Sequence, residues 1–228
     1  GSAVAMSYFV DIGGPPYVVV CQTRPEMSVV YQGLMSQPGR VYPLNKGTKI
    51  VSVPERQWPC IVVDIVDEQQ QELSFLPPGI LYISPQDTIV ATRDMYTDRN
   101  ITIADLQTQT AETIRGSEHQ LHEKIEMHLY EDWLVLTGLR HIGGDFYDTE
   151  YVVQAWSVDH LMNPTRIWER TSRGDRESLD PPMISEDLAL VYLGDDGWQV
   201  LSRTNGASLV TMPRNLRRHR VVAPRYRS

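Results

Sequence analysis

Glu131-Asp132-Trp133-Leu134-Val135 is the stretch of sequence that best predicts the fold, because the chain contains two further versions of it. These are Gln86-Asp87-Thr88-Ile89-Val90 and Glu186-Asp187-Leu188-Ala189-Leu190, so the aspartates recur at spacings of 45 and 55 residues. In each version a polar turn leads into a short aliphatic or β-branched run, which is the pattern of a β-strand. Recurrence at such spacings indicates a repeat architecture.

A second set of predicted strands follows these stretches. Four apolar segments each lead into a turn and a further strand, and they span residues 60–64, 101–105, 152–156 and 198–202. Asn205-Gly206, after the last of them, is the strongest hairpin signal in the chain. Apolar and polar residues alternate over Lys124-Ile125-Glu126-Met127-His128-Leu129, as in a strand with one solvated face. The only helical candidate is residues 117–123.

Units of about four strands account for nearly the whole chain. Three regular units span residues 77–121, 122–178 and 179–213, and two looser ones span 7–44, which ends with the strand Arg40-Val41-Tyr42, and 45–76. A lone antiparallel sheet buries its faces poorly, so such units must stack. We predict an all-β fold, a β-propeller-like stack of about five four-stranded antiparallel units, as a five-bladed ring or part of a larger ring. A β-sandwich is the alternative, because it has similar strand numbers and turn spacings.

Two lines of the sequence carry a family resemblance. Val152-Val153-Gln154-Ala155-Trp156-Ser157-Val158, together with Arg166-Ile167-Trp168-Glu169, resembles the WD-repeat-like propellers of the degenerate kind found in F-box proteins. The Gly-His and Trp-Asp pairs of ordinary WD repeats are absent. The resemblance implies a protein-interaction platform that recruits substrates to a cullin-type ubiquitin ligase, with the F-box upstream of this sequence.

The charge distribution argues against nucleic-acid binding by the body of the protein. Acidic residues number 29 against 21 basic ones, which gives a net charge of −8, whereas a phosphate backbone requires a basic face. The last 15 residues, however, contain six arginines: Arg214, Arg217, Arg218, Arg220, Arg225 and Arg227. This tail could contact nucleic acid or act as a nuclear address, pair with the acidic body, or form a solvated tail or closing strand.

Composition and targeting signals indicate in which cellular compartment the protein is expected. The longest uninterrupted apolar run is residues 188–193, far short of the roughly 20 residues of a membrane span. No signal peptide is visible, and Cys21 and Cys60 both adjoin apolar strands, so we expect buried thiols in a reducing compartment. We therefore expect a cytoplasmic or nuclear protein without a membrane partner. Residues 1–6 are expected to be a leader, 7–213 the propeller-like domain, and 214–228 the basic tail or closing strand.

Patterns of catalytic or metal-binding residues are weak throughout the chain. His119, His122 and His128 lie near several glutamates, but we interpret them as residues of a solvated loop and strand face rather than as zinc ligands. Asp64 and Asp105 fall at equivalent repeat positions, which indicates strand-end residues rather than an acid–base pair. No nucleophile or phosphate-binding motif is present. We expect no catalytic residue, no metal and no cofactor.

The segment 141–150 is the best candidate for a binding surface, because it reads as an insertion between two strands that combines a Gly-Gly pair, aromatic residues and acids. Exposed aromatic rings beside an arginine are typical interface anchors. The predicted binding residues are Arg140, Asp145, Phe146, Tyr147 and Asp148. An ordinary solvated insertion is the alternative interpretation.

The sequence favours a non-enzymatic protein-interaction platform whose partners are proteins. The alternative is a propeller-type carbohydrate-active enzyme or lectin that uses acidic loop residues. An enzyme requires carboxylates or histidines that converge in one pocket with perturbed pKa values, whereas a platform requires exposed aromatic and arginine side chains. Trp133, Trp156 and Trp168 are predicted to belong to one unit and to be buried between sheets.

Overall fold

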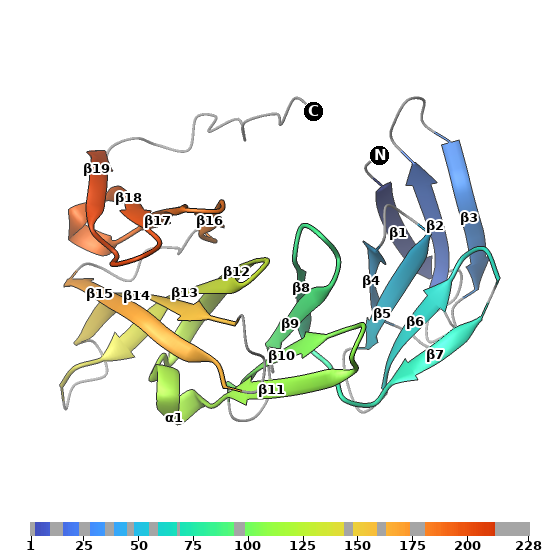
Figure 1. Cartoon of the computed structure of the whole chain (residues 1–228), viewed down its shortest axis with the longest axis horizontal. Helices are drawn as coiled ribbons and strands as arrows, with labels where there is room; N and C mark the ends of the chain where they lie inside the picture. The colour runs from blue at the N-terminus through green and yellow to red at the C-terminus, as the bar shows by residue number, and fades with distance from the viewer. Residues whose placement is uncertain are drawn as a thin grey trace. The chain divides into compact units, whose positions relative to one another are not determined.

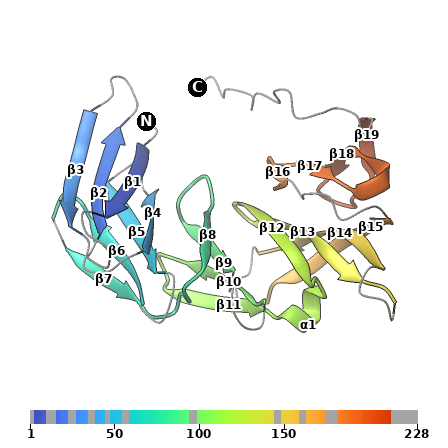
Figure 2. The ribbon, with the colours of Figure 1, turned by 180° about the vertical axis from the view of Figure 1, so that it is seen from behind.

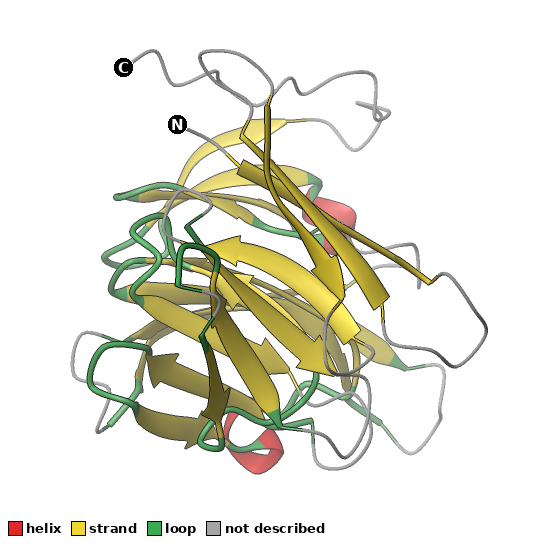
Figure 3. Ribbon diagram, turned by 90° about the vertical axis from the view of Figure 1, so that its right-hand side faces the viewer, coloured by secondary structure: helices red, strands yellow, loops and turns green. Residues whose placement is uncertain are grey.

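The structure is a computed structural model of the 228-residue chain. It describes residues 3–9, 16–22, 28–34, 39–44, 48–54, 59–67, 69–93, 99–143, 148–158, 163–173 and 181–212, with side chains from residue 40 onward. The fold is built almost entirely of strands (Figure 3). None of the described helices is long and apolar enough to cross a membrane.

The described strands form five sheets, and strands that follow one another in sequence are neighbours in each sheet (Figure 1). The first sheet has three strands, β1 (Ala3–Phe9), β2 (Pro16–Gln22) and β3 (Ser28–Leu34). The second contains β4 (Gly39–Leu44), β5 (Lys49–Pro54), β6 (Cys60–Asp64) and β7 (Gln70–Leu73). The third contains β8 (Ile80–Ile83), β9 (Ile89–Arg93), β10 (Ile101–Asp105) and β11 (Thr110–Ile114).

The two C-terminal sheets have four strands each (Figure 2). The fourth sheet contains β12 (Glu123–Tyr130), β13 (Trp133–His141), β14 (Thr149–Ser157) and β15 (Thr165–Arg173). The fifth contains β16 (Met183–Ile184), β17 (Leu188–Tyr192), β18 (Trp198–Ser202) and β19 (Ser208–Met212). Two short helical turns, α1 (Gly116–His119) and η2 (Gly194–Asp196), complete the described elements.

The repeat predicted from the sequence is confirmed. Val90, Val135 and Leu190 lie on β9, β13 and β17, each the second strand of its sheet. The turn aspartates precede these strands at the predicted positions. Three buried hydroxyl residues, Ser52 on β5, Thr92 on β9 and Thr137 on β13, also occupy second strands. Thr92 and Thr137 each stand five residues after the turn aspartate, so the repeated pattern of residues includes buried core positions.

The predicted boundary of the first unit is wrong. Residues 40–42 belong to β4, whose residues pair with β5 from Gly39↔Pro54 to Leu44↔Lys49, so this strand opens the second sheet rather than closing the first. Its apolar pattern is that of any strand, and only long-range pairing shows which sheet it joins. β1 begins at Ala3, inside the segment expected to be a leader. The helical candidate at 117–123 is reduced to the single turn α1, and β12 begins at Glu123.

The chain divides into two compact units, each described by itself. Unit 1 takes in residues 1–119, 129–133 and 157–165, and unit 2 takes in 120–128, 134–156 and 166–228. The core of unit 1 lies between the sheets β4–β7 and β8–β11, and its buried members are Leu44, Val51, Val53, Cys60, Leu73, Leu76, Leu81, Val90 and Ala104. Cys60 is thus a buried free thiol, as predicted, and burial raises its pKa to about 12.

Three tryptophans are buried in the sheet β12–β15, as predicted. Trp133, Trp156 and Trp168 lie on β13, β14 and β15. The indole Nε1 of Trp168 donates to the carbonyl oxygen of Arg203 at 2.6 Å, in the turn between β18 and β19. Gly206 in the same turn has φ +65°, and a Cβ there would lie 2.7 Å from Cδ2 of Trp168. This contact between two sheets of unit 2 requires glycine both for its backbone conformation and for its lack of a side chain.

We expect Gly206→Ala to destabilise the protein by about 1–3 kcal/mol, because it combines a left-handed backbone with overpacking against a fixed ring. Urea denaturation would measure the loss. Gly143→Ala is the matched control, because its Cβ would meet mainly the movable side chain of Asp148. Equal stability of the two variants would contradict the role assigned to Gly206.

The buried hydroxyls provide a second test. The side-chain oxygens of Thr92 and Thr137 have no hydrogen-bond partner among the described residues, whereas Thr102 Oγ1 lies 3.2 Å from Thr113 Oγ1. Burying an unpaired hydroxyl costs about 1–3 kcal/mol, so Thr92→Val should raise the free energy of unfolding. Thr102→Val should lower it by about 0.5–1.5 kcal/mol. A stability loss of similar size in both variants would show that the Thr92 hydroxyl is satisfied.

Candidate functional site

The base of the predicted binding loop is a charged network across three strands of unit 2. Arg140, near the end of β13, donates from Nε to Glu150 Oε1 on β14 at 2.7 Å. Its Nη2 lies 2.9 Å from Glu169 Oε1 on β15. The other oxygen of Glu169 accepts from Arg166 Nη1 at 2.8 Å. One guanidinium therefore joins three adjacent strands beneath the loop.

Amide and indole groups extend this network. Gln154 Nε2 donates to Glu169 Oε2 at 2.8 Å, and Trp156 Nε1 donates to Gln154 Oε1 at 3.1 Å. The guanidinium carbon of Arg166 lies 6.0 Å from the centroid of the Trp156 ring, at the outer limit of a cation–π contact. The carboxylate of Glu169 thus has several hydrogen-bond donors, which stabilises this partly buried network.

The environment of Arg140 strengthens its charge. Its side chain is only 19% exposed. Burial alone would lower the pKa of the guanidinium, but the hydrogen bonds and charges of Glu150 and Glu169 outweigh it and raise the pKa. Arg140 therefore stays charged at any pH at which the protein folds. It braces the loop, and at least two of its donors are already engaged.

The loop itself is described only at its two ends. Asp145, Phe146 and Tyr147, three of the predicted binding residues, lie outside the described residues. Asp148 is exposed, and its carbonyl oxygen accepts from the amide of Ile142 at 3.0 Å. Ile142 is 41% exposed. The structure thus places Arg140 and Asp148 at the loop base, with an apolar side chain facing solvent beside them.

Glu150 and Glu169 were not predicted from the sequence as partners of Arg140. Glu150 was part of the segment 141–150, but Glu169 is 29 positions from Arg140, and only the order β13-β14-β15 brings it near. A signal was present in the sequence, because each glutamate is the single acid of its strand. An acid at such a position usually has a partner.

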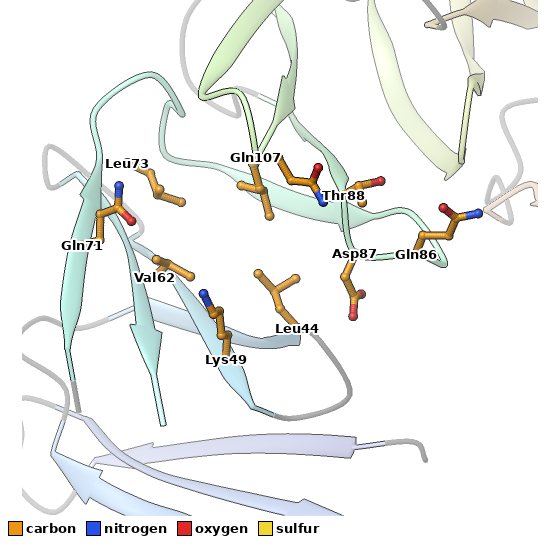
Figure 4. A pocket seen from close by; sticks show the side chains of 10 residues that line it. Leu44, Lys49, Val62, Gln71, Leu73, Gln86, Asp87, Thr88 and Gln107 are labelled. Carbon is orange, nitrogen blue, oxygen red and sulfur yellow. The ribbon is translucent and has the colours of Figure 1, made fainter. Parts of the chain in front are cut away.

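A pocket of about 270 Å³ lies in unit 1, between the ends of the sheets β4–β7 and β8–β11. Its apolar lining consists of Leu44, Val62, Leu73 and Leu106. Figure 4 shows polar side chains around them, namely Lys49, Gln71, Gln86, Asp87, Thr88 and Gln107. Lys49 also forms an exposed pair with Asp64 at 3.6 Å. An apolar floor with a polar rim could accept one apolar side chain of a partner.

Asp64 and Asp105 are strand-end residues, as predicted. Each carboxylate accepts two backbone amides of the following turn, from Val66 and Asp67 in one case and from Gln107 and Thr108 in the other. The amide of Val66 is the main cause that lowers the pKa of Asp64. These aspartates shape the turns between third and fourth strands.

The histidines form only part of the solvated face that the sequence predicted, since His122 and His128 are half-buried and His119 is not exposed at all. His119 is buried, and its Nε2 lies 2.8 Å from the carbonyl oxygen of Arg99. His128 Nδ1 contacts the carbonyl oxygen of Pro182 at 2.8 Å. The expectation was wrong for His119 because this residue ends the single turn α1, where its ring meets the Arg99 carbonyl, 20 positions earlier in the chain. In the part of the chain that the structure describes, no three His, Cys, Asp or Glu residues are placed to hold a metal ion.

Glu131 is an acidic group of unit 1 whose pKa is raised rather than lowered. Burial raises the pKa of Glu131, and the charges of Asp132 and Asp87 add to this, while the backbone amide of Gln86 opposes it. These are the turn residues of the repeat signature. Their grouping follows from the repeat.

Comparisons with solved structures identify the fold class. The chain matches Hsv2p from Kluyveromyces lactis with a TM-score of 0.56 and 15% identity, over 92% of this chain and 60% of that one. It matches a europium-containing methanol dehydrogenase with a TM-score of 0.55 and 10% identity, over 93% and 49%. BamB from Moraxella catarrhalis matches with a TM-score of 0.50 and 14% identity, over 78% and 50%.

These structures are β-propellers, and with the repeated four-stranded sheets they show that the chain has a β-propeller-like fold. The chain spans between about half and three fifths of the length of these proteins. No protein-family model matches it, and no curated protein matches it in sequence.

We expect Arg140→Met to cost about 1–3 kcal/mol of stability, because it leaves two largely buried carboxylates without their shared partner. Lys49→Met is the matched control, since it removes an exposed pair at 3.6 Å and should leave the denaturation midpoint nearly unchanged. Urea denaturation of both variants would measure the difference. Equal midpoints would mean that the Arg140 network contributes nothing to the loop base.

Proposed function

We propose that this propeller-like chain is a protein-interaction platform and that the β13–β14 loop is one of its contact surfaces. The observation that carries the proposal is the braced base of that loop, where Arg140 joins β13 to Glu150 and Glu169 on the next two strands. Binding residues are most effective on loops held by a rigid scaffold, because less conformational entropy is lost on binding.

The chemistry of the loop fits a protein partner. Ile142 is exposed at its start, and Phe146 and Tyr147 follow within five residues. Aromatic residues contribute much of the binding energy in protein interfaces. Asp145 and Asp148 supply acceptors for a polar rim around them. The binding residues proposed are therefore those predicted from the sequence, with Arg140 as the residue that positions the loop.

The enzyme and lectin alternative has less support. Its acidic loop residues would have to converge in one pocket. Asp64 and Asp105 are instead engaged by the amides of their own turns, and the 270 Å³ pocket of unit 1 contains one carboxylate, that of Asp87. A pocket with a single acid and no histidine lacks the paired groups that glycoside chemistry uses.

A narrower form of the proposal is that the platform recruits substrates to a cullin-type ubiquitin ligase in the cytoplasm or nucleus. It is supported by the resemblance of residues 152–158 and 166–169 to propellers of F-box proteins. Co-purification of the full-length protein with a cullin and its adaptor would support this role. A full-length protein that is captured with partners but never with a cullin would exclude it.

The test of the platform is a loop variant that carries Ile142→Ser, Phe146→Ser and Tyr147→Ser. We expect its unfolding midpoint to match that of the wild type, because Ile142 is exposed and follows the end of β13. Partner capture from a lysate, quantified by mass spectrometry, should fall by about tenfold or more, as for hot-spot losses.

The matched control is Val66→Ser, which removes a 76% exposed apolar side chain from a turn of unit 1. It should leave capture unchanged. A loop variant that is unfolded would show that the loop is structural, and a folded variant with undiminished capture would show that the loop is not a contact surface.

A further inference from the structure

The hairpin turn between β18 and β19 contains a chemically reactive pair of residues that the proposed function does not use. The chain has five asparagines, at positions 45, 100, 163, 205 and 215, and Asn205 alone is followed by glycine. Glycine has no Cβ to hinder the approach of its amide nitrogen to the side-chain carbonyl carbon of the preceding asparagine. Asparagine therefore deamidates most readily before glycine. Asn205 is also exposed, so water reaches its carboxamide.

Both groups that would react are hydrogen-bonded in the folded turn. The nucleophile, the amide nitrogen of Gly206, donates to the carbonyl oxygen of Ser202 at 2.9 Å. The electrophile, the carboxamide of Asn205, accepts through Oδ1 from the amide of Ala207 at 2.9 Å. Ring closure requires the Gly206 amide to leave Ser202 and the carboxamide to leave Ala207. The folded turn therefore opposes the reaction that its sequence favours.

Two side chains of β15 hold this turn in place. The ring of Trp168 covers Gly206, and its Nε1 donates to the carbonyl oxygen of Arg203 at 2.6 Å. Arg170 Nε donates to the carbonyl oxygen of Gly206 at 2.8 Å. The hydrogen bonds that restrain the reacting groups are thus maintained by contacts from the neighbouring sheet of unit 2.

We propose that Asn205 is a deamidation site that the contact with β15 protects, and that it is converted irreversibly once the turn is displaced from β15. The Gly206 nitrogen loses its proton to solvent base and attacks Cγ of Asn205. The N–Cγ bond forms, the Cγ–Nδ2 bond breaks, and the leaving nitrogen takes a proton from water and departs as ammonia. Water then opens the succinimide. Cleavage at the main-chain carbonyl carbon gives isoaspartate, and cleavage at Cγ gives aspartate.

The isoaspartyl product does not fit the folded turn. Its chain runs through Cγ, so the main chain between residues 205 and 206 gains a methylene group. Gly206 is held by its bond to Ser202 as well as by the two β15 side chains, and packed contacts of this kind do not stretch to accept an added group. A chain that has reacted therefore cannot restore the original contact between the two sheets, and Asn205 becomes a permanent mark of their separation.

The experiment measures isoaspartate at residue 205 of the full chain at mildly alkaline pH. Incubation in water enriched in a heavy oxygen isotope marks the conversions that occur in the protein, and digestion in ordinary water follows. Trypsin releases residues 204–214, which contain Asn205 and no other asparagine, and electron-transfer fragmentation distinguishes isoaspartate from aspartate. Conversion should be at least about tenfold slower in the folded chain than in urea, because the folded turn reacts only during local unfolding.

Trp168→Phe should raise the conversion rate of the folded chain about tenfold, because it keeps an aromatic ring but removes the Nε1 donor to Arg203. Trp156→Phe is the matched control, since it removes the indole donor to Gln154 on β14 of the same sheet. It should react at the wild-type rate. Equal acceleration by the two variants would overturn the proposal, because it would show that general destabilisation controls the reaction.

Arg170→Met removes the second hydrogen bond from β15 and should raise the rate about threefold. This variant decides the question if Trp168→Phe fails to fold. Equal rates in the folded and the urea-unfolded wild type, or a wild-type rate in every folded β15 variant, would also overturn the proposal. A product that contains aspartate alone would exclude the succinimide, because direct hydrolysis of the carboxamide gives no isoaspartate.

Discussion

The structure depends on one constraint, which is that the middle strands of each sheet must be covered on both faces. On β13, seven consecutive residues are buried, and on β10 the first four are. A strand with one solvated face would alternate between buried and exposed positions. Continuous burial requires a second layer on each side, so no unit of four strands is stable alone. The repeat, the apolar runs and the stacked core all follow from this requirement.

The same constraint explains which parts of the fold could be predicted from sequence. Turn aspartates followed by apolar runs are local signals, and they located β9, β13 and β17 correctly. The position of Arg40-Val41-Tyr42 was predicted wrongly because the sheet to which a strand belongs is decided by distant pairing. The inward direction of His119 was missed for a similar reason, since its partner, the Arg99 carbonyl, lies 20 residues away.

The candidate site likewise has one part that could be predicted from the sequence and one part that could not. Arg140 and Asp148 could be found because arginine and acids stand out beside an insertion, yet the role of Arg140 could not. The order of strands β13, β14 and β15 brings Glu169 near Arg140. The Arg140 donors that the sequence assigned to a binding partner therefore bind a carboxylate within the sheet. Other charged side chains also have structural roles, since the acids of the repeat mainly shape turns. What remains for recognition is the loop that the Arg140 network supports.

The contact between Trp168 and the β18–β19 turn has a consequence for the order in which the protein opens. The last sheet is small, with a first strand, β16, of only two residues. Trp168 donates to the carbonyl oxygen of Arg203, and its ring covers Gly206. The β18–β19 turn can therefore separate from β15 only when the Trp168 indole becomes exposed to water. Amide hydrogen exchange in β18 and in β15 should accordingly share one opening free energy, which makes these strands of different sheets a single cooperative segment.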